Sequence, residues 1–559
     1  MTANDEGRGS SGLLGRLPAE VLNQVFYQLH NIDLKTLRQT CTYIKDATHL
    51  RLNRLFLSPN FRDIEVFRAV ADHETFRLQV TEIIYDDARF DPAHEMEWPS
   101  WYDQEDDIGE VTGVPEWYRH VYRQNRRMIR RYKPHHSQVK EAFEHLLSPA
   151  EAFKHFKRLW QEQQETIATN RDADELRYGL LRFPNLRRMV VSPAAHGKPG
   201  LPWYLTPTIR SLPRGLLYPI ERGWPLTKMH SNFPEARDWD RSEKDKWRGY
   251  CLVSRIMAQH LRENPESKLA DLAIDTNQLR TGISCRMFDD AENSEIKDLN
   301  TILNHPGFAG LDLSLHCGNQ CNMNWCSFRS NHLRNTLSIA TDIQHFSLFT
   351  NVVYVDDFDD SDDSDGEEGD HFIPLHSIFP VNDWHQLRHF GLSRFIVKKD
   401  DVIKFLRALP PTLESVELSF FIFMPDSGDY HSLVHDMREK LGWRERNAEN
   451  QPKIVVRVDV RFAKVHGAVM MDVSREVTNF MYQNGENPFE QDEGCVEDPY
   501  IPQSDTPQGN GRLLDAFDPN FEEPNIQVHA MEKSEEVLRL RETKSSEMYA
   551  PGHISNSHV

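Results

Sequence analysis

LRHFGLSRFIVKKDDVIKFLRALPPTLESVEL, residues 387–418, is the stretch that decides the fold prediction, because it combines two short strands with a helix between them. Apolar residues stand at positions i, i+3 and i+5 near each of its ends: Leu387, Phe390 and Leu392, then Leu413, Val416 and Leu418. Side chains alternate along a strand, so the last two residues of each triplet point to one face. Asp400 can cap the intervening helix, and Pro410 with Pro411 ends it. The stretch therefore predicts a strand–helix–strand unit.

Five more triplets with the same spacing occur earlier in the chain: Val80/Ile83/Tyr85, Leu186/Met189/Val191, Leu269/Leu272/Ile274, Phe308/Leu311/Leu313 and Ile343/Phe346/Leu348. Successive triplets begin 106, 83, 39, 35, 44 and 26 residues apart. The last separation fits the ~20–29-residue period of leucine-rich repeats, whose strands carry this signature. Two interpretations of residues 58–490 stay open. We favour an irregular leucine-rich-repeat-like α/β solenoid with long insertions over an ordinary α/β domain with buried strands.

Residues 16–57 predict a separate module of three short helices. Pro18 suits the first helical position, and Asp33 can cap the second helix. The apolar residues fall into three groups: Val21, Leu22, Val25, Phe26 and Leu29; Leu34, Leu37, Cys41 and Ile44; Leu50, Leu52, Leu55 and Phe56. So short a module buries little apolar surface, and it is therefore either a partner-binding unit or a helical cap on the following domain.

The pattern Leu17-Pro18-x-Glu20-Val21-Leu22-x-x-Val25-Phe26-x-x-Leu29, followed by Asp33-Leu34-x-x-Leu37-Arg38-x-x-Cys41, resembles the F-box motif. The sequence after it, in 55–60, 63–68 and 85–90, is similar to filamentous-fungal F-box proteins. The resemblance implies that the module binds a Skp-type adaptor, which joins a cullin and a RING subunit. The residues implied in that contact are Leu17, Pro18, Val21, Leu22, Val25, Phe26 and Leu37. Ile44 stands where many F-boxes carry an aromatic residue, so adaptor affinity could be weaker.

This resemblance implies a function as the substrate-recognition subunit of an SCF-type (Skp–cullin–F-box) ubiquitin ligase that recruits an unknown protein target. A scaffold that binds the Skp adaptor alone is the alternative, and an enzyme with an appended F-box is a second rival. We expect no catalytic activity and no cofactor, because the sequence lacks GxGxxG after a strand, GxxxxGK[ST], HExxH and GxSxG.

The bulk composition predicts an intracellular protein in cytoplasm or nucleus. The 559 residues carry a formal net charge of −21, which disfavours binding to nucleic acid or anionic membranes. Seven cysteines are too few for a secreted disulfide scaffold, so we expect reduced thiols. The first fifteen residues resemble no secretory signal, and no window approaches the ~20 apolar residues of a membrane span.

Two segments suggest binding sites that we weigh against simpler structural roles. Residues 93–135 interleave aromatic residues with arginines, a pattern that can bind nucleic acid, but a packed surface helix is favoured in so acidic a chain. His316, Cys317, Cys321 and Cys326 invite a zinc interpretation. Their CxxxC and CxxxxC spacings lack the usual paired knuckles, so we predict free thiols and no metal.

The remaining segments predict little ordered structure. Residues 355–370, VDDFDDSDDSDGEEGD, form an acidic loop in which Ser361 and Ser364 are candidate sites for an acidophilic kinase. Residues 1–15 and 491–559 are polar and are predicted to be disordered, with one short helix at 531–541.

Overall fold

The computed structural model describes ten main stretches: 17–29, 31–90, 112–131, 144–197, 202–220, 235–276, 281–318, 323–352, 372–460 and 469–489. The isolated positions 199, 224, 225, 279, 320 and 321 are also described. The predictions for residues 1–15, for the acidic loop at 355–370 with Ser361 and Ser364, and for the tail at 491–559 lie outside these residues.

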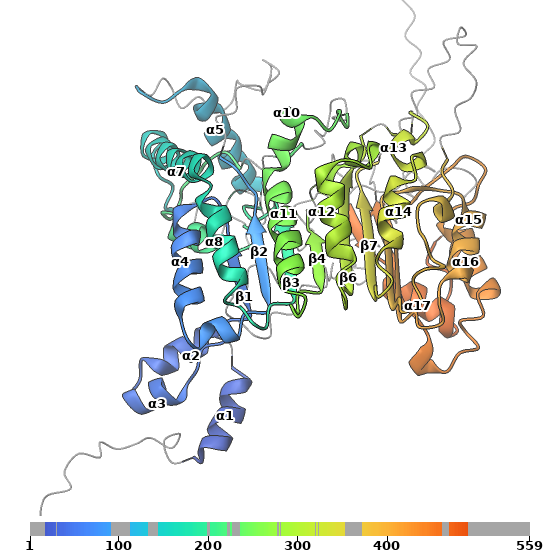
Figure 1. The fold of residues 1–559 in the computed structure, drawn as a ribbon, viewed down its shortest axis with the longest axis horizontal. Helices are drawn as coiled ribbons and strands as arrows, with labels where there is room; N and C mark the ends of the chain where they lie inside the picture. The colour runs from blue at the N-terminus through green and yellow to red at the C-terminus, as the bar shows by residue number, and fades with distance from the viewer. Residues whose placement is uncertain are drawn as a thin grey trace, which may run out of the picture.

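The core of the protein is one open parallel sheet whose nine main strands follow one another in chain order (Figure 1). Their bounds are β1 Arg54–Leu57, β2 Glu82–Asp86, β3 Arg188–Ser192, β4 Asp271–Ile274, β6 Gly310–His316, β7 His345–Thr350, β8 His389–Ser393, β10 Ser415–Ser419 and β12 Lys453–Val455. Every neighbouring pair is parallel. The predicted α/β class is therefore confirmed.

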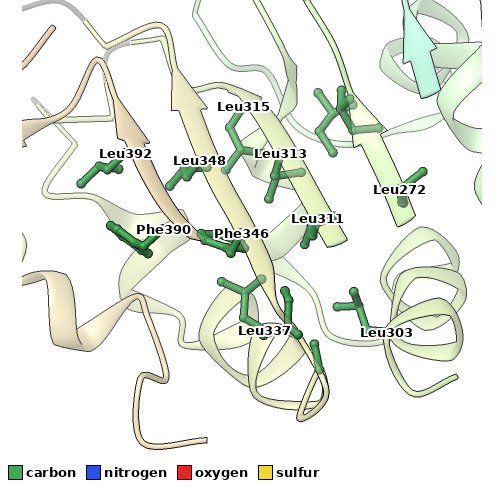
Figure 2. Close-up of a cluster of buried hydrophobic side chains, with 14 of the residues drawn as sticks. Leu272, Leu303, Leu311, Leu313, Leu315, Leu337, Phe346, Leu348, Phe390 and Leu392 are labelled. Carbon is green, nitrogen blue, oxygen red and sulfur yellow. The ribbon is translucent and has the colours of Figure 1, made fainter. Parts of the chain in front are cut away.

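All seven apolar triplets fall on strands of this sheet, and they fall in register. The middle residues of the triplets pair across six successive ladders: Ile83, Met189, Leu272, Leu311, Phe346, Phe390 and Val416. Equal positions on aligned parallel strands point to the same face, so these side chains form one continuous apolar row. Figure 2 shows part of this row, with Leu303 and Leu337 of the covering helices beside it.

Helices cover the apolar face of the sheet as a second layer. Figure 1 shows α4, α8, α11, α12 and α14 side by side in front of the strands, and each contacts the next. The longer helices are α4 Phe61–Asp72, α7 Pro149–Thr169, α8 Arg171–Leu180, α11 Arg248–Glu263, α12 Ser294–Leu303, α14 His332–Ser338, α15 Lys399–Ala408, α16 Tyr430–Lys440 and α17 Ser474–Tyr482. The helix predicted between Leu392 and Leu413 is α15, but its cap residue is Lys398, and the predicted cap Asp400 lies inside the first turn.

Shorter elements complete the described part of the fold. The short helices are α9 Pro207–Ser211, α10 Arg241–Lys244 and α13 Cys326–Arg329. The 3₁₀ turns are Phe76–Leu78, Asp245–Trp247, Cys285–Asp289, Leu375–Ser377 and Ala448–Asn450. Strand β5 Ile283–Ser284 pairs with β6, β9 Ile396–Val397 pairs with β11 Ile422–Phe423, and β13 Arg457–Val460 pairs antiparallel with β14 Val469–Asp472.

The N-terminal helices differ from the prediction in four ways. They are α1 Ala19–Tyr27, α2 Asn31–Arg38 and α3 Thr42–Ala47. The second predicted helix is divided in two, because Cys41 is extended and begins α3 instead of continuing α2. The third predicted helix is wrong: Leu55 and Phe56 lie on β1, where alternation sends Leu55 into the sheet's core. The sheet therefore starts before the predicted module boundary at residue 57. Pro18 precedes α1 as its cap residue, one position earlier than predicted.

A buried ionic network ties the second strand to two helices. Arg248, the first residue of α11, donates to both carboxylate oxygens of Asp172 on α8, at 2.7 and 3.0 Å. The hydroxyl of Tyr85 on β2 donates to the same carboxylate. Asp172 is fully buried, so these donors replace the water that its charge would otherwise hold.

Candidate protein-interaction surfaces

The N-terminal helices divide the seven predicted adaptor-binding residues between a small core and an exposed surface. Leu22 and Phe26 are buried with Leu34 and Ile44 in a cluster of their own. The half-buried Leu17 and Leu37 pack against that cluster, whereas Pro18, Val21 and Val25 are exposed. Leu22 and Phe26 therefore hold the helices together, and the other residues are accessible to a partner to different degrees.

Exposed apolar side chains concentrate on these helices. Val21 and Val25 are 39% and 38% exposed, and they lie one turn apart on α1, so they form one stripe. Tyr27 and Tyr43 add aromatic surface at 66% and 49% exposure. These are four of the eight large hydrophobic residues that are exposed among the described residues. Such clustering marks a surface that another protein can cover.

The second candidate surface is the face of the sheet opposite the helices. One polar row crosses five adjacent strands, β4, β6, β7, β8 and β10, and a second row crosses the last four of them at equal register. The first row is Asp271, Gly310, His345, His389 and Ser415, and the second is Asp312, Ser347, Gly391 and Glu417. We call these two rows the polar face. Sequence patterning missed it because only the apolar positions of the strands were compared.

Hydrogen bonds and ring stacking link the polar face across its strands. The Asp312 carboxylate accepts from Arg188 Nη2 at 2.9 Å and lies 2.6 Å from His345 Nε2. The rings of His345 and His389 stack with centroids 4.3 Å apart and planes inclined by 11°. His389 Nδ1 is in turn 2.7 Å from Ser415 Oγ. The face is therefore a connected array of donors and acceptors.

Two glycines make room for this array. A Cβ on Gly310 would lie 2.3 Å from an Asp271 carboxylate oxygen, and one on Gly391 would lie 2.6 Å from Ser347 Oγ. Any larger residue would displace the neighbouring polar groups. The side chain of His345 is 42% exposed, and that of Asp312 is 27% exposed. The array is therefore open enough to contact another molecule.

Charge coupling sets the ionisation of this face. Burial favours the neutral form of Asp312, but the charge and hydrogen bond of His345, helped by Arg188, hold the pKa of that carboxyl well below its usual range. Burial and the charge of His345 lower the pKa of His389 to about 4. Near neutral pH Asp312 is therefore a carboxylate, and His389 is a neutral imidazole.

This lowered pKa predicts acid-dependent stability. Between pH 6.5 and about 4 the unfolded chain binds a proton at His389 that the folded chain does not bind. The free energy of unfolding should therefore fall by on the order of 1–2 kcal/mol as the pH is lowered through this window. Urea unfolding at pH 7.0 and 4.5 would measure the loss. His389→Gln should reduce the difference, while His385→Gln at an exposed loop position should not; an equal loss in both variants would contradict the assignment.

The other half of the same sheet face is covered. Phe56, Ile84, Val190 and Ala273 pack beneath Ala195 and Tyr204. Tyr204 also donates to Asp275 Oδ2 at 2.8 Å. The open polar face therefore starts at about β4, with Arg188 of β3 at its margin.

The aromatic and basic insertion is described only over residues 112–131. It forms α5 (Glu116–Arg131), whose Tyr118 and Tyr122 are buried against α7 and residues 216–218. Their hydroxyls donate to the carbonyls of Leu217 and Leu147 at 2.7 and 2.6 Å. These two rings belong to a packed helix, so they are unavailable for stacking on bases.

The histidine and cysteines considered for zinc differ in exposure and in hydrogen-bond partners. His316 is buried with Nδ1 2.8 Å from Asn351 Nδ2, and Cys317 and Cys321 are buried. Cys326 is exposed and lies 3.6 Å from Gln320. Within the described stretches, no three His, Cys, Asp or Glu side chains are grouped to hold a metal. Burial raises the pKa of the Cys317 thiol well above its usual value, which favours the thiol over the thiolate.

Comparisons with known proteins assign no family to this chain. No protein-family model matches the chain, and no curated protein matches it either. Across the part of the chain that the structure describes, no helix has the length and apolar character needed to span a membrane.

Proposed function

We propose that this protein is the substrate-recognition subunit of an SCF-type ubiquitin ligase, in which α1–α3 bind a Skp-type adaptor and the sheet recruits a protein target. The observation that carries the proposal is the exposed stripe of Val21 and Val25 on a motif that resembles an F-box. Cullin and RING subunits would join through the adaptor. The protein itself would act by holding the target near the conjugating enzyme, without catalysis of its own.

The architecture of the N-terminal helices supports adaptor binding. Among the described side chains of these helices, four form the buried cluster, which is a small core for an independent unit. A partner that covers Val21, Val25 and the neighbouring Tyr27 would bury further apolar surface. Arg51 joins the module to the rest of the chain, because it donates to the carbonyl of Tyr27 at 2.8 Å and exchanges backbone hydrogen bonds with the side chain of Asn31.

The sheet supports recruitment of a protein. Parallel strands in chain order, backed by helices on one face, favour the leucine-rich-repeat-like solenoid over an ordinary α/β domain. The polar face spans five strands, and none of its residues lines the cavities of about 250 and 220 Å³ found elsewhere in the described structure. A broad surface that exposes Asp312, His345 and Ser347 suits contact with a protein better than enclosure of a small substrate.

The double variant Val21→Asp/Val25→Asp is expected to abolish co-purification of the Skp-type adaptor, because it places two charges within the apolar contact. Both side chains are exposed, so the fold should persist. Leu181→Asp is the matched control, since Leu181 is 70% exposed and follows α8. Adaptor retained by the double variant, with unfolding curves unchanged, would refute the proposed contact.

The scaffold alternative differs in whether a cullin is present. Purification of the full-length wild-type protein with the proteasome blocked should recover adaptor, cullin and target together. Adaptor without cullin would favour the scaffold that binds the Skp adaptor alone. The Val21/Val25 variant should lose adaptor and cullin together and still retain the target, because the polar face is unchanged.

A further inference from the structure

A cavity of about 250 Å³ opens at the N-terminal edge of the sheet. We call it the edge pocket, and its ten lining residues include Arg54, Leu55 and Phe56 of β1, Arg62 of α4 and Arg210 of α9. Strand β1 pairs on one side with β2, and no other described strand lies beyond it. Successive side chains of a strand point to opposite faces, so a pocket lined by Arg54, Leu55 and Phe56 together lies at the strand's edge.

The walls of the edge pocket come from both layers of the fold. Helix α4 contributes Arg62 and Val66 on one side, and α9 contributes Pro207 and Arg210 on the other. The two helices are fixed to each other because the Thr208 N–H donates to the buried carboxylate of Asp63 at 2.7 Å. Asp63 lies next to Arg62 in the chain. The pocket therefore lies between two helices that are joined by a buried hydrogen bond.

The chemistry of the lining is unusual for this chain. Six of its ten residues are apolar, three are arginines and none is acidic, although the chain has 86 acidic residues against 65 basic ones. Arg54 is buried in an ion pair with Glu82. The side chain of Arg62 is 57% exposed beside Glu65, and Arg210 Nε donates to the Leu205 carbonyl at 2.8 Å. An anion with an apolar body complements such a lining.

The size and position of the pocket distinguish among anionic ligands. Its volume of about 250 Å³ is below the about 300–1,000 Å³ of pockets that enclose drug-sized molecules. It suits one large side chain. All four residues of β1 are buried, so the exposed arginines at the rim and the apolar side chains below them are the groups that a ligand can contact. We propose that the edge pocket binds an acidic segment of a partner protein, with one large apolar side chain on its floor and carboxylates at Arg62 and Arg210.

The test measures binding of the fluorescein-labelled peptide DEDFDED to the full-length protein by fluorescence anisotropy. Replacing its phenylalanine by glycine, or its acids by lysines, should each weaken binding at least about tenfold, because the floor or the arginines lose their partner. Higher salt should weaken binding as well. Glycine-peptide binding equal to that of the phenylalanine peptide would overturn the role of the apolar floor.

The protein variant Arg62→Glu/Arg210→Glu should also weaken binding of DEDFDED at least about tenfold. Arg177→Glu/Arg388→Glu is the matched control, because Arg177 and Arg388 are exposed and ion-paired as Arg62 is, but lie away from the pocket. If both double variants lost peptide affinity equally, the change in net charge alone would explain the loss, and the proposed binding site would be refuted. If 3-phenylpropionate displaced the peptide with a dissociation constant equal to that of the peptide, the pocket would be a site for small carboxylates, and the proposed peptide site would be refuted. This site is independent of adaptor binding, so the Val21/Val25 variant should bind the peptide normally.

Discussion

Arg248→Leu is expected to lower the free energy of unfolding by about 3–5 kcal/mol, because it leaves a buried carboxylate without its cationic partner. Asp172 has no solvent exposure, and Arg248 is its bidentate donor. The Tyr85 hydroxyl would remain as a neutral donor. A neutral hydrogen bond cannot compensate for the lost charge, so the Asp172 carboxylate would be buried without a cationic partner.

Urea denaturation of purified wild type and variant would measure the loss. Arg177→Leu is the control on the neighbouring helix, because its ion pair with Asp174 is exposed at 48% and 73% of the two side chains. Exposed pairs of this kind contribute about 0–1 kcal/mol. The double variant Asp172→Leu/Arg248→Leu removes both charges and should recover part of the stability. If Arg248→Leu loses no more stability than Arg177→Leu, the buried ion pair contributes no more to the free energy of unfolding than an exposed pair.

Phe346→Ala is the second large effect, with an expected loss of about 3–5 kcal/mol. Phe346 is fully buried at the centre of the apolar row (Figure 2). The centroid of its ring lies 4.9 Å from that of Trp384, 5.7 Å from that of Phe379 and 6.1 Å from that of Phe390. These large rings cannot close the space that an absent phenyl group leaves, so both transfer free energy and a cavity contribute.

The same strand provides the control. Phe349 lies three residues along β7, on the opposite face, and is half-exposed. Phe349→Ala should therefore cost much less, and Phe346→Leu should fall between the two because it keeps most of the volume. Chemical denaturation of the three variants would test this order. A Phe349→Ala loss equal to that of Phe346→Ala would contradict the assignment of faces.

The strands were predictable because one face of each carries the same apolar spacing. Strand β1 has this spacing too, in Leu52, Leu55 and Leu57, but the leucines before it also fit a helix. Over so short a segment, the residue types fit the helical spacing of apolar residues as well as the alternation of a strand. Strand β12 escaped detection because polar Gln451 stands where an apolar residue opens the other triplets.

The polar face could not be predicted for a different reason. Asp312, His345 and His389 occupy the alternate positions of strands that had been identified, yet 77 residues separate the first from the last. Only the register of the ladders brings them together, and long connections of variable length conceal that register in the sequence. The edge pocket likewise needs the contact between α4 and α9, for which no sequence pattern exists.

The chain order of the strands also has a consequence for how the protein folds. Neighbouring strands are joined by connections of very different length: 21 residues from β8 to β10 and 24 from β1 to β2, but 101 from β2 to β3. Closing a short connection costs the least chain entropy. We expect assembly to begin around β8 and β10 and to spread outward by adding one strand at a time. The N-terminal helices, which lie with β1 and β2 beyond the longest connection, would be positioned last.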